Sequence, residues 1–313
     1  MLIGHDAAWD AWRRASAGER MHHAWLLTGR KGVGKSLFAH AAARELVGAT
    51  GENHPDIYEL TYAAKDDKEE RKRADGKPFE LARSIRIAQI RALQQRLTTR
   101  PTLGSKRAII IDPADDLERS AANALLKSLE EPPYGTIFLL VAHRPARLLP
   151  TIRSRCRTVR FPAVPDDQMA DLLSRLEPDV SAEARAAAIK AAGGSPGAAL
   201  AFVRMELGKA ASLMRSILDE GDRGFALRGA LAGVIGARPD RERLQAILDL
   251  ARAALAERLE RHSGDPTLLI EAHAELVRLT GEQPTYNYDP GLLAMEIGTL
   301  LAKAGAASET AHA

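Results

Sequence analysis

The feature that most constrains this chain is an eight-residue, glycine-rich loop at positions 29–36. An apolar run at 24–28 leads into the loop, and a helical pattern begins directly after it. In loops of this form the glycines let backbone N–H groups surround a phosphate, Lys35 provides charge for the outer phosphates, and the Ser36 hydroxyl can bind Mg²⁺. The amino end of the following helix adds to this field. The residues that we expect to hold a nucleotide are Gly29, Arg30, Lys31, Gly32, Val33, Gly34, Lys35 and Ser36.

Length and composition bear on the number of domains, on cysteine chemistry and on the cellular location of the chain. It has 313 residues, which suggests two or three domains, and 45% of them are apolar, so a sizeable core can be buried. The single cysteine, Cys156, excludes an internal disulfide and a cysteine-based zinc site. No apolar stretch approaches the ~18 residues that span a bilayer, and Asp6 and Asp10 interrupt the amino end, unlike in a secretory signal. We therefore expect a cytoplasmic protein without membrane contact.

Apolar runs alternate with helical patterns over the first half of the chain, which predicts an α/β fold with a doubly wound parallel sheet flanked by helices. The run at 108–112 is rich in β-branched residues, as is typical of a strand buried on both faces. The charge-rich segment 65–77 ends in a turn signal, and we interpret it as a solvated loop, with a basic recognition arm as the alternative. The expected strands are 24–28, 57–61, 108–112, 137–141 and 158–161, and the expected helices are 7–15, 37–47, 87–97 and 120–131.

A change of pattern after prolines 162 and 165 marks a domain boundary, because every periodic segment beyond them is helical and rich in alanine. The predicted domains are an α/β domain at 1–163, a small helical domain at 164–205 and a larger helical domain at 206–313. In the last of these, five apolar residues fall on one helical stripe and are predicted to be core: Leu244, Leu248, Ala251, Leu255 and Leu259.

The predicted strand at 108–112 ends in Asp112, which can hold Mg²⁺ through water. A hydrolysing phosphate-loop enzyme normally follows this aspartate with a glutamate that activates the attacking water, but here the next residue is Pro113. We interpret Asp115 and Asp116 as charges at the start of a helix. Hydrolysis by the isolated chain is therefore expected to be weak.

Four blocks of the sequence resemble one family: Ile3–His5, His22–Gly29, Asn123–Pro133 and Leu148–Cys156. They are similar to the bacterial clamp loaders of the AAA+ class, and most closely to the delta-prime subunits of DNA polymerase III. The resemblance covers roughly residues 3–205, and beyond them it rests on helical character and on Asn287–Pro290. It implies an AAA+ phosphate-loop domain, a small helical lid and an all-α collar that holds subunits together.

In that family, five subunits form a spiral that opens a ring-shaped sliding clamp and sets it on primed DNA, powered by ATP in neighbouring subunits. The resemblance implies that Ser154 and Arg155 belong to a motif that projects Arg155 into the adjacent subunit's nucleotide site, as an arginine finger in trans. The alternative is that Arg155 pairs with a carboxylate beside the last predicted strand. The implied partners are the hydrolysing ATPase subunits, the clamp-opening delta subunit and, through the complex, the sliding clamp and primed DNA.

The chain departs from the family pattern at several positions. It lacks the four cysteines that often bind zinc in delta-prime relatives, so we expect no zinc and a turn at 48–53 without metal. Gly197 stands where active clamp-loader ATPases carry an arginine that senses the γ-phosphate. The phosphate loop itself is complete. We expect ATP or ADP to bind with Mg²⁺ at Ser36 and Asp112, with negligible turnover.

Two other classes of function stay open at this point. One is a catalytically active AAA+ ATPase, either a hydrolysing clamp-loader subunit or a branch-migration helicase, with which Pro113 and Gly197 conflict. The other is an unrelated phosphate-loop kinase, which has no use for an outward-directed arginine at position 155.

Further residues outside these motifs also have interpretations. Six arginines lie between positions 144 and 160 without interleaved aromatic residues, and we favour pairing at subunit interfaces over contact with the DNA backbone. His22 and His23 flank a predicted buried strand, and we expect them to pack near the nucleotide base. Cys156 has no partners in the sequence that would activate a thiolate, so we expect a small buried apolar side chain.

Overall fold

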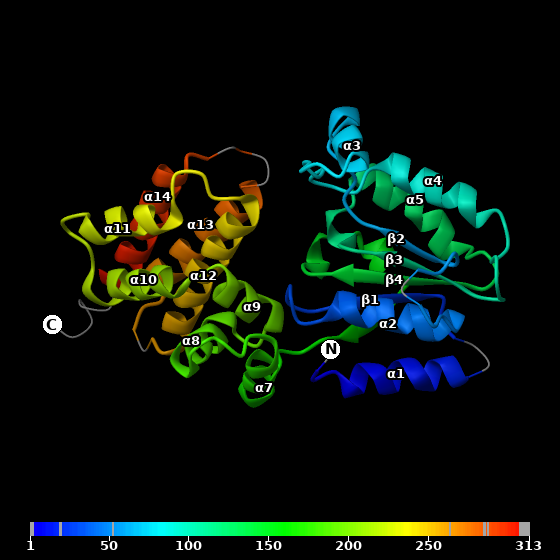
Figure 1. The fold of residues 1–313 in the computed structure, drawn as a ribbon, viewed down its shortest axis with the longest axis horizontal. Helices are drawn as coiled ribbons and strands as arrows, with labels where there is room; N and C mark the ends of the chain where they lie inside the picture. Colours follow the sequence, from blue (N-terminus) through cyan, green and yellow to red (C-terminus); the bar gives the residue numbers. More distant parts are fainter. Residues whose placement is uncertain are drawn as a thin grey trace. The chain divides into compact units, whose positions relative to one another are not determined.

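The computed structural model describes residues 3–18, 21–51, 53–262, 264–283, 286 and 288–306. It divides the chain into two compact units, Met1–Val164 and Pro165–Ala313 (Figure 1). The first unit carries the sheet, and the described elements of the second are all helices. The predicted finer division of the second unit at residues 205 and 206 stays a prediction. Glu52 of the predicted turn and Asn287 of the family resemblance lie outside the described residues.

A five-stranded parallel sheet forms the centre of the first unit, with the order β2-β3-β4-β1-β5. Every residue of β1, β3 and β4 is buried, because helices cover both faces of these central strands. The predicted α/β fold is confirmed, and each expected strand lies within one residue of its predicted bounds. The strands are β1 (Ala24–Thr28), β2 (Ile57–Leu60), β3 (Arg107–Ile111), β4 (Thr136–Ala142) and β5 (Arg157–Arg160).

Helices lie on both faces of this sheet (Figure 1). They are α1 (Asp6–Ala17) and α2 (Lys35–Val47) on one face, and α4 (Ile87–Leu97) and α5 (Arg119–Glu130) on the other. Successive residues of β3 alternate between two cores, since strand side chains point to opposite faces. Ile110 packs in the core beneath α1 and α2, whereas Ile109 and Ile111 pack in the core beneath α4 and α5. In the first core, Trp12 is fully buried, and its ring centroid lies 5.2 Å from that of Trp25.

The prediction of a loop at 65–77 is wrong, because this segment contains the helix α3 (Asp67–Ala74). Asp66 caps the helix by accepting a hydrogen bond from the backbone N–H of Glu69. The Glu69 carboxylate is itself buried, and it accepts hydrogen bonds from Lys72 Nζ at 2.7 Å and from the backbone N–H of Glu80 at 2.8 Å. Acidic residues in the first turn and basic residues in the last turn also match the helix dipole. These local interactions stabilise a helix despite its highly polar composition.

The second unit contains two groups of helices that pack within themselves. The first group is α7 (Asp166–Leu176), α8 (Ala182–Ala192) and α9 (Pro196–Arg204). The second is α10 (Gly208–Glu220), α11 (Ala226–Ile235), α12 (Arg241–Glu260), α13 (Thr267–Glu282) and α14 (Pro290–Ala306). The predicted stripe lies on α12, where its first four members are buried and Leu259 is 36% exposed. Among the helices of the described ranges, none is long and apolar enough to cross a membrane.

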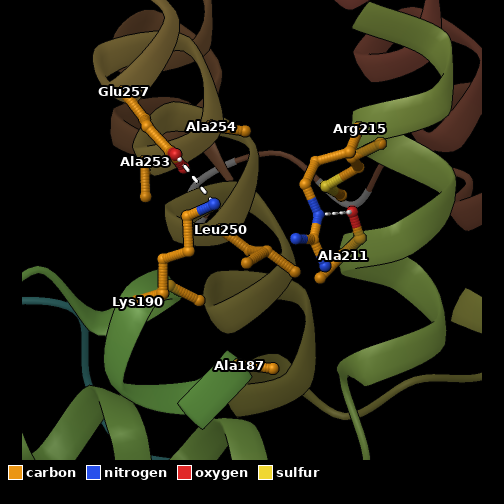
Figure 2. A pocket seen from close by; sticks show the side chains of 10 residues that line it. Ala187, Lys190, Ala211, Arg215, Leu250, Ala253, Ala254 and Glu257 are labelled. Carbon is orange, nitrogen blue, oxygen red and sulfur yellow. Dashed lines mark hydrogen bonds and ion pairs between the residues drawn. The ribbon is translucent and has the colours of Figure 1, made fainter. Parts of the chain in front are cut away.

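Figure 2 shows a pocket between α8, α10 and α12 in this unit. Its volume is about 40 Å³, and half of its lining residues are alanine, with Lys190 Nζ and Glu257 Oε1 paired at 3.1 Å. A ligand site of ordinary size occupies roughly 300–1,000 Å³. The pocket is therefore a packing gap with room for a few waters, and it is too small for a nucleotide.

Candidate nucleotide-binding site

The phosphate loop at 29–36 connects the carboxyl end of β1 to the amino end of α2. Its backbone requires glycine at several positions, because Gly32 and Gly34 have φ values of 81° and 106°. Gly29 is required for a second reason: a Cβ atom there would lie 2.4 Å from the carbonyl oxygen of Phe161, just beyond β5. The turn thus points the start of α2 at the carboxyl edge of the sheet, where ligands bind in folds of this type.

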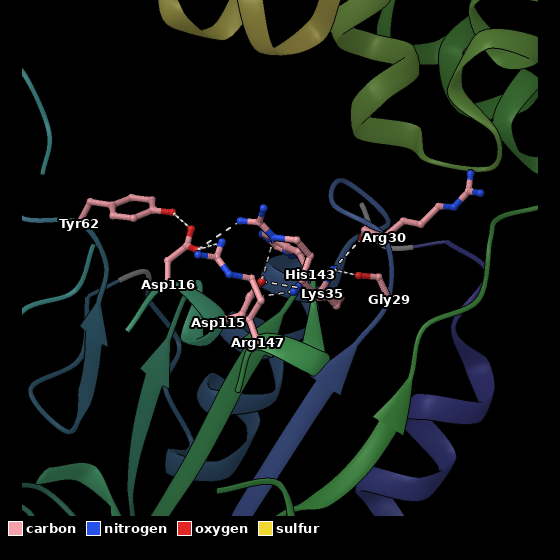
Figure 3. Close-up of polar contacts among 9 residues, drawn as sticks. Gly29, Arg30, Lys35, Tyr62, Asp115, Asp116, His143 and Arg147 are labelled. Atoms are coloured by element: carbon pink, nitrogen blue, oxygen red, sulfur yellow. Dashed lines mark hydrogen bonds and ion pairs between the residues drawn. The ribbon is translucent and has the colours of Figure 1, made fainter. Parts of the chain in front are cut away.

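Lys35 lies inside this loop. Its Nζ donates hydrogen bonds to the carbonyl oxygens of Gly29 and Arg30, each at 2.7 Å (Figure 3). The residue is only 2% exposed, and burial lowers the pKa of Lys35 to about 8, partly offset by the charges of Asp112 and Asp115. The side chain therefore provides a desolvated ammonium group at the position where the sequence predicts phosphate.

The two expected magnesium ligands lie together. The Ser36 hydroxyl forms a hydrogen bond with the Asp112 carboxylate, although burial still raises the pKa of Asp112 above its ordinary value. Oxygen atoms are the ligands that Mg²⁺ prefers, and the ion usually combines one or two protein oxygens with substrate phosphates and water. These residues fit that mode. Across the described residues, no group of three or more His, Cys, Asp and Glu side chains is arranged to hold a metal by itself.

Asp115 and Asp116 have partners that the sequence interpretation did not include. They lie in a single 3₁₀ turn, η1 (Ala114–Asp116), rather than at the start of a helix of ordinary length. Asp115 is buried and accepts hydrogen bonds from the backbone N–H groups of His143 and Arg144, at 2.9 and 2.8 Å. Asp116 accepts a hydrogen bond from the Tyr62 hydroxyl at 2.5 Å and pairs with the Arg144 and Arg147 guanidinium groups. Both carboxylates are therefore committed to structural contacts (Figure 3).

His143 is a site residue that the sequence analysis missed. It directly follows β4, the strand beside β1, and therefore lies at the same edge of the sheet as the phosphate loop. Burial lowers the pKa of His143 to about 4, and the nearby charges of Lys35 and Lys31 act in the same direction. Its Nδ1 atom is buried and has no hydrogen-bond partner within the described part of the chain. The position, at the carboxyl end of a central parallel strand, was the available signal.

His5 supports the loop from the amino-terminal segment. Its Nε2 atom lies 2.6 Å from the carbonyl oxygen of Val33, and its ring meets that of Phe161 edge-on at 4.8 Å. Burial lowers the pKa of His5 below its ordinary value. The segment 3–5, one of the blocks that carry the family resemblance, thus braces the phosphate loop.

The structure separates Arg155 from the phosphate loop of its own chain. Arg155 follows the short helix α6 (Pro150–Arg153) and precedes β5, whose first residue, Arg157, is level with Trp25 at the amino end of β1. The loop follows the opposite end of β1, a strand whose five residues span four steps, or about 13 Å at ~3.3 Å per residue. Arg155 therefore lies at the amino edge of the sheet and its own loop at the carboxyl edge.

The Arg155 guanidinium lies at the surface in an ion pair. Its Nη2 atom is 2.6 Å from Oε1 of Glu130, and its Nη1 donates to the carbonyl oxygen of Thr151 at 2.9 Å. The side chain is 35% exposed. Ser154 is also exposed, and its hydroxyl donates to the same Thr151 carbonyl at 3.1 Å. The carboxylate pairing that the sequence analysis kept as an alternative is thus present, and the guanidinium remains accessible to solvent.

Three other predictions concern residues around this motif. Cys156 is only partly buried rather than fully buried as expected, but it packs against the core beneath α4 and α5, and burial raises the pKa of its thiol to about 12. Arg144 and Arg147 of the arginine cluster pair within the chain, with Asp116. His22 and His23 have structural contacts, and His23 Nε2 lies 2.8 Å from the Leu129 carbonyl oxygen.

The expected position of these two histidines near the nucleotide base is wrong. Both precede β1 and therefore lie at the amino edge of the sheet, whereas the phosphate loop follows the carboxyl end of that strand. Proximity in the sequence to the loop was misleading, because an extended strand separates its two ends by its full length.

Comparisons with known proteins agree with this architecture. Residues 4–165 match the model of the family described as DNA polymerase III, delta subunit. The chain is 34% identical over 202 residues to the DNA polymerase III subunit delta′ of Pseudomonas aeruginosa, a match that covers 59% of this chain and 57% of that protein. It is 32% identical over 200 residues to the subunit delta′ of Escherichia coli, covering 58% and 55%. The matches thus span little more than half the length of these relatives.

A solved structure of another protein has a similar fold. A DNA polymerase III, gamma subunit-related protein from Thermotoga maritima superposes with a TM-score of 0.53, covering 95% of this chain and 99% of that one at 16% identity. At this identity the likeness shows the fold alone. The family match covers more than half of the chain and includes the phosphate loop, Asp112, His143 and Arg155. This chain therefore belongs to the family described as DNA polymerase III, delta subunit.

Proposed function

We propose that this chain is a clamp-loader subunit of the delta-prime type, which works in the bacterial cytoplasm during DNA replication. It binds ATP or ADP with Mg²⁺, hydrolyses it poorly or not at all, and contributes Arg155 to the nucleotide site of a neighbouring ATPase subunit. Its partners are the other loader subunits, and it reaches the sliding clamp and primed DNA through the complex. Residues 164–205 act as a lid and residues 206–313 as a collar in this proposal.

The position of Arg155 is the observation that carries the proposal. Because Arg155 and the phosphate loop lie at opposite edges of one sheet, separated by the length of β1, about 13 Å at ~3.3 Å per residue, the guanidinium is out of reach of phosphates bound to its own chain. It is nevertheless partly exposed to solvent. A partly exposed arginine so placed can act on a nucleotide held by another subunit. There it would stabilise the charge that spreads over the γ-phosphoryl oxygens during transfer.

The residues around Asp112 support weak hydrolysis in cis. Attack by water requires a group that orients it and accepts its proton, and Pro113 has no such group. Asp115 and Asp116 are occupied by backbone and arginine partners. His143 has a pKa of about 4, which makes it a weak base at neutral pH. Gly197, in the first turn of α9, brings no guanidinium to the site.

Nucleotide binding can be tested on the isolated chain. We expect equilibrium dialysis with ATP or ADP and Mg²⁺ to show binding that Lys35→Ala abolishes, because the buried ammonium group is lost. A steady-state assay of the same protein should show negligible ATP hydrolysis. Absence of nucleotide at millimolar concentration would contradict the binding role.

Robust hydrolysis would favour a second candidate, a catalytically active AAA+ ATPase. The observation in its favour is the complete set of Lys35, Ser36 and Asp112 around the loop. The steady-state assay therefore separates the two functions directly.

The trans role of Arg155 requires a reconstituted complex. Arg155→Ala should leave assembly intact and slow the partner's ATP hydrolysis by roughly 10³- to 10⁵-fold, the range typical of arginine fingers. Arg153→Ala is the matched control, because Arg153 is an exposed arginine on α6 two residues away. Normal hydrolysis and clamp loading by the Arg155→Ala complex would refute the assignment.

A further inference from the structure

We infer that Glu130 is a positioning residue for Arg155: it fixes the direction of the guanidinium that the neighbouring subunit's nucleotide meets. The inference rests on the proposed trans role of Arg155. Its basis is the contact between the last residue of α5 and the segment that follows α6, which are 25 positions apart in the sequence.

Two partners hold the guanidinium at different nitrogen atoms. Glu130 Oε1 contacts Nη2 at 2.6 Å, and the Thr151 carbonyl oxygen accepts from Nη1 at 2.9 Å. An arginine has five N–H donors in a rigid plane, so these two contacts fix the plane and leave further donors for a phosphate. The backbone beneath is also fixed, because Ile152 is fully buried and its carbonyl accepts from the Arg155 backbone N–H at 3.1 Å.

Local helix energetics do not explain a glutamate at position 130. The carboxyl end of a helix carries partial negative charge, so a carboxylate in the last turn is unfavourable. A second carboxylate, Glu131, follows immediately. Arg155 supplies the positive charge that offsets this arrangement. Departures from local preference of this kind are expected at functional sites.

Because the Arg155–Glu130 pair is partly exposed, we expect it to orient the Arg155 side chain rather than to stabilise the fold. The Arg155 and Glu130 side chains are 35% and 48% exposed, and ion pairs at such surfaces add little to the free energy of folding. The same exposure leaves the arginine free to meet an anion from outside. The pair can therefore direct the side chain without contributing measurably to the fold.

The test compares Glu130→Gln with Glu131→Gln in the reconstituted complex. Both variants remove one exposed carboxylate, and only the first removes the partner of Arg155. We expect Glu130→Gln to lower the kcat of the partner ATPase by about two- to fivefold, the range of a half-exposed pair. The KM for ATP, complex assembly and the urea midpoint of the isolated chain should stay unchanged. Glu131→Gln should match the wild type in every measurement.

A double variant tests whether Glu130 acts through Arg155 or independently of it. In an Arg155→Ala background, Glu130→Gln should cause no further loss of kcat, because the group that it positions is absent. An unchanged or raised kcat for the single Glu130→Gln variant, or an equal loss in both backgrounds, would overturn the positioning role while leaving the trans role of Arg155 in place. If Arg155→Ala itself had no effect, the proposed function would fail and the positioning role with it.

Discussion

Asp115 allows a sharp test of how the carboxyl edge of the sheet is held together. Its carboxylate is 1% exposed and accepts hydrogen bonds from two backbone N–H groups that follow β4, those of His143 and Arg144. Asp116, the next residue, is 18% exposed and pairs with two arginines at the surface. The substitutions Asp115→Asn and Asp116→Asn therefore make the same chemical change in a buried and in a more exposed setting.

The expected magnitudes differ for these two positions. Asparagine at 115 keeps one acceptor oxygen and turns an NH₂ group toward the other N–H, so one charge-assisted hydrogen bond is lost and one buried donor is left unpaired. Such a loss destabilises by about 2–3 kcal/mol. At Asp116 the change removes mainly surface ion pairs, which are worth at most about 1 kcal/mol. The variant at 115 should therefore be the more destabilised by at least 1 kcal/mol.

Urea unfolding followed by tryptophan fluorescence measures this difference in the first structural unit, which contains both aspartates. All three tryptophans, Trp9, Trp12 and Trp25, lie in the first unit, so the signal reports the unfolding of the sheet domain. With a slope of roughly 2 kcal/mol/M, the Asp115→Asn midpoint should fall by about 1 M. A shift below about 0.2 M, or equal shifts for both variants, would refute the reasoning that buried backbone contacts decide the role of Asp115.

Two further predictions concern single titratable groups. Because burial lowers the pKa of Lys35 to about 8, the ammonium group loses its proton above that pH, and nucleotide affinity should fall by up to about tenfold per pH unit. Isothermal titration at several pH values above about 7.5, where phosphate charge is constant, checks this, and a constant affinity up to pH 9.5 would contradict it. Because burial raises the pKa of Cys156 to about 12, its thiol should react with Ellman's reagent at pH 8 only after unfolding. Rapid reaction of the native chain would show that the thiol is accessible as a thiolate.

Local sequence was sufficient for the parts of the fold that depend on near neighbours. The central strands could be located because helices bury them on both faces, which requires uninterrupted apolar residues, as in Ala108–Ile111. The phosphate loop could be located because Gly32 and Gly34 need left-handed backbone angles that other residues rarely adopt. By contrast, composition misled at α3, where the cap at Asp66 and the buried contacts of Glu69 outweigh a highly polar sequence.

The sequence by itself therefore determined the α/β fold, the phosphate loop with Lys35, Ser36 and Asp112, and the replacement of the usual glutamate by Pro113. Only the tertiary structure decided which residues share an edge of the sheet. It brings His143 to the phosphate loop, places Arg155 at the far edge, and pairs that arginine with Glu130. The reason is that parallel pairing aligns the ends of strands that are far apart in the sequence, and no short segment of sequence contains that register.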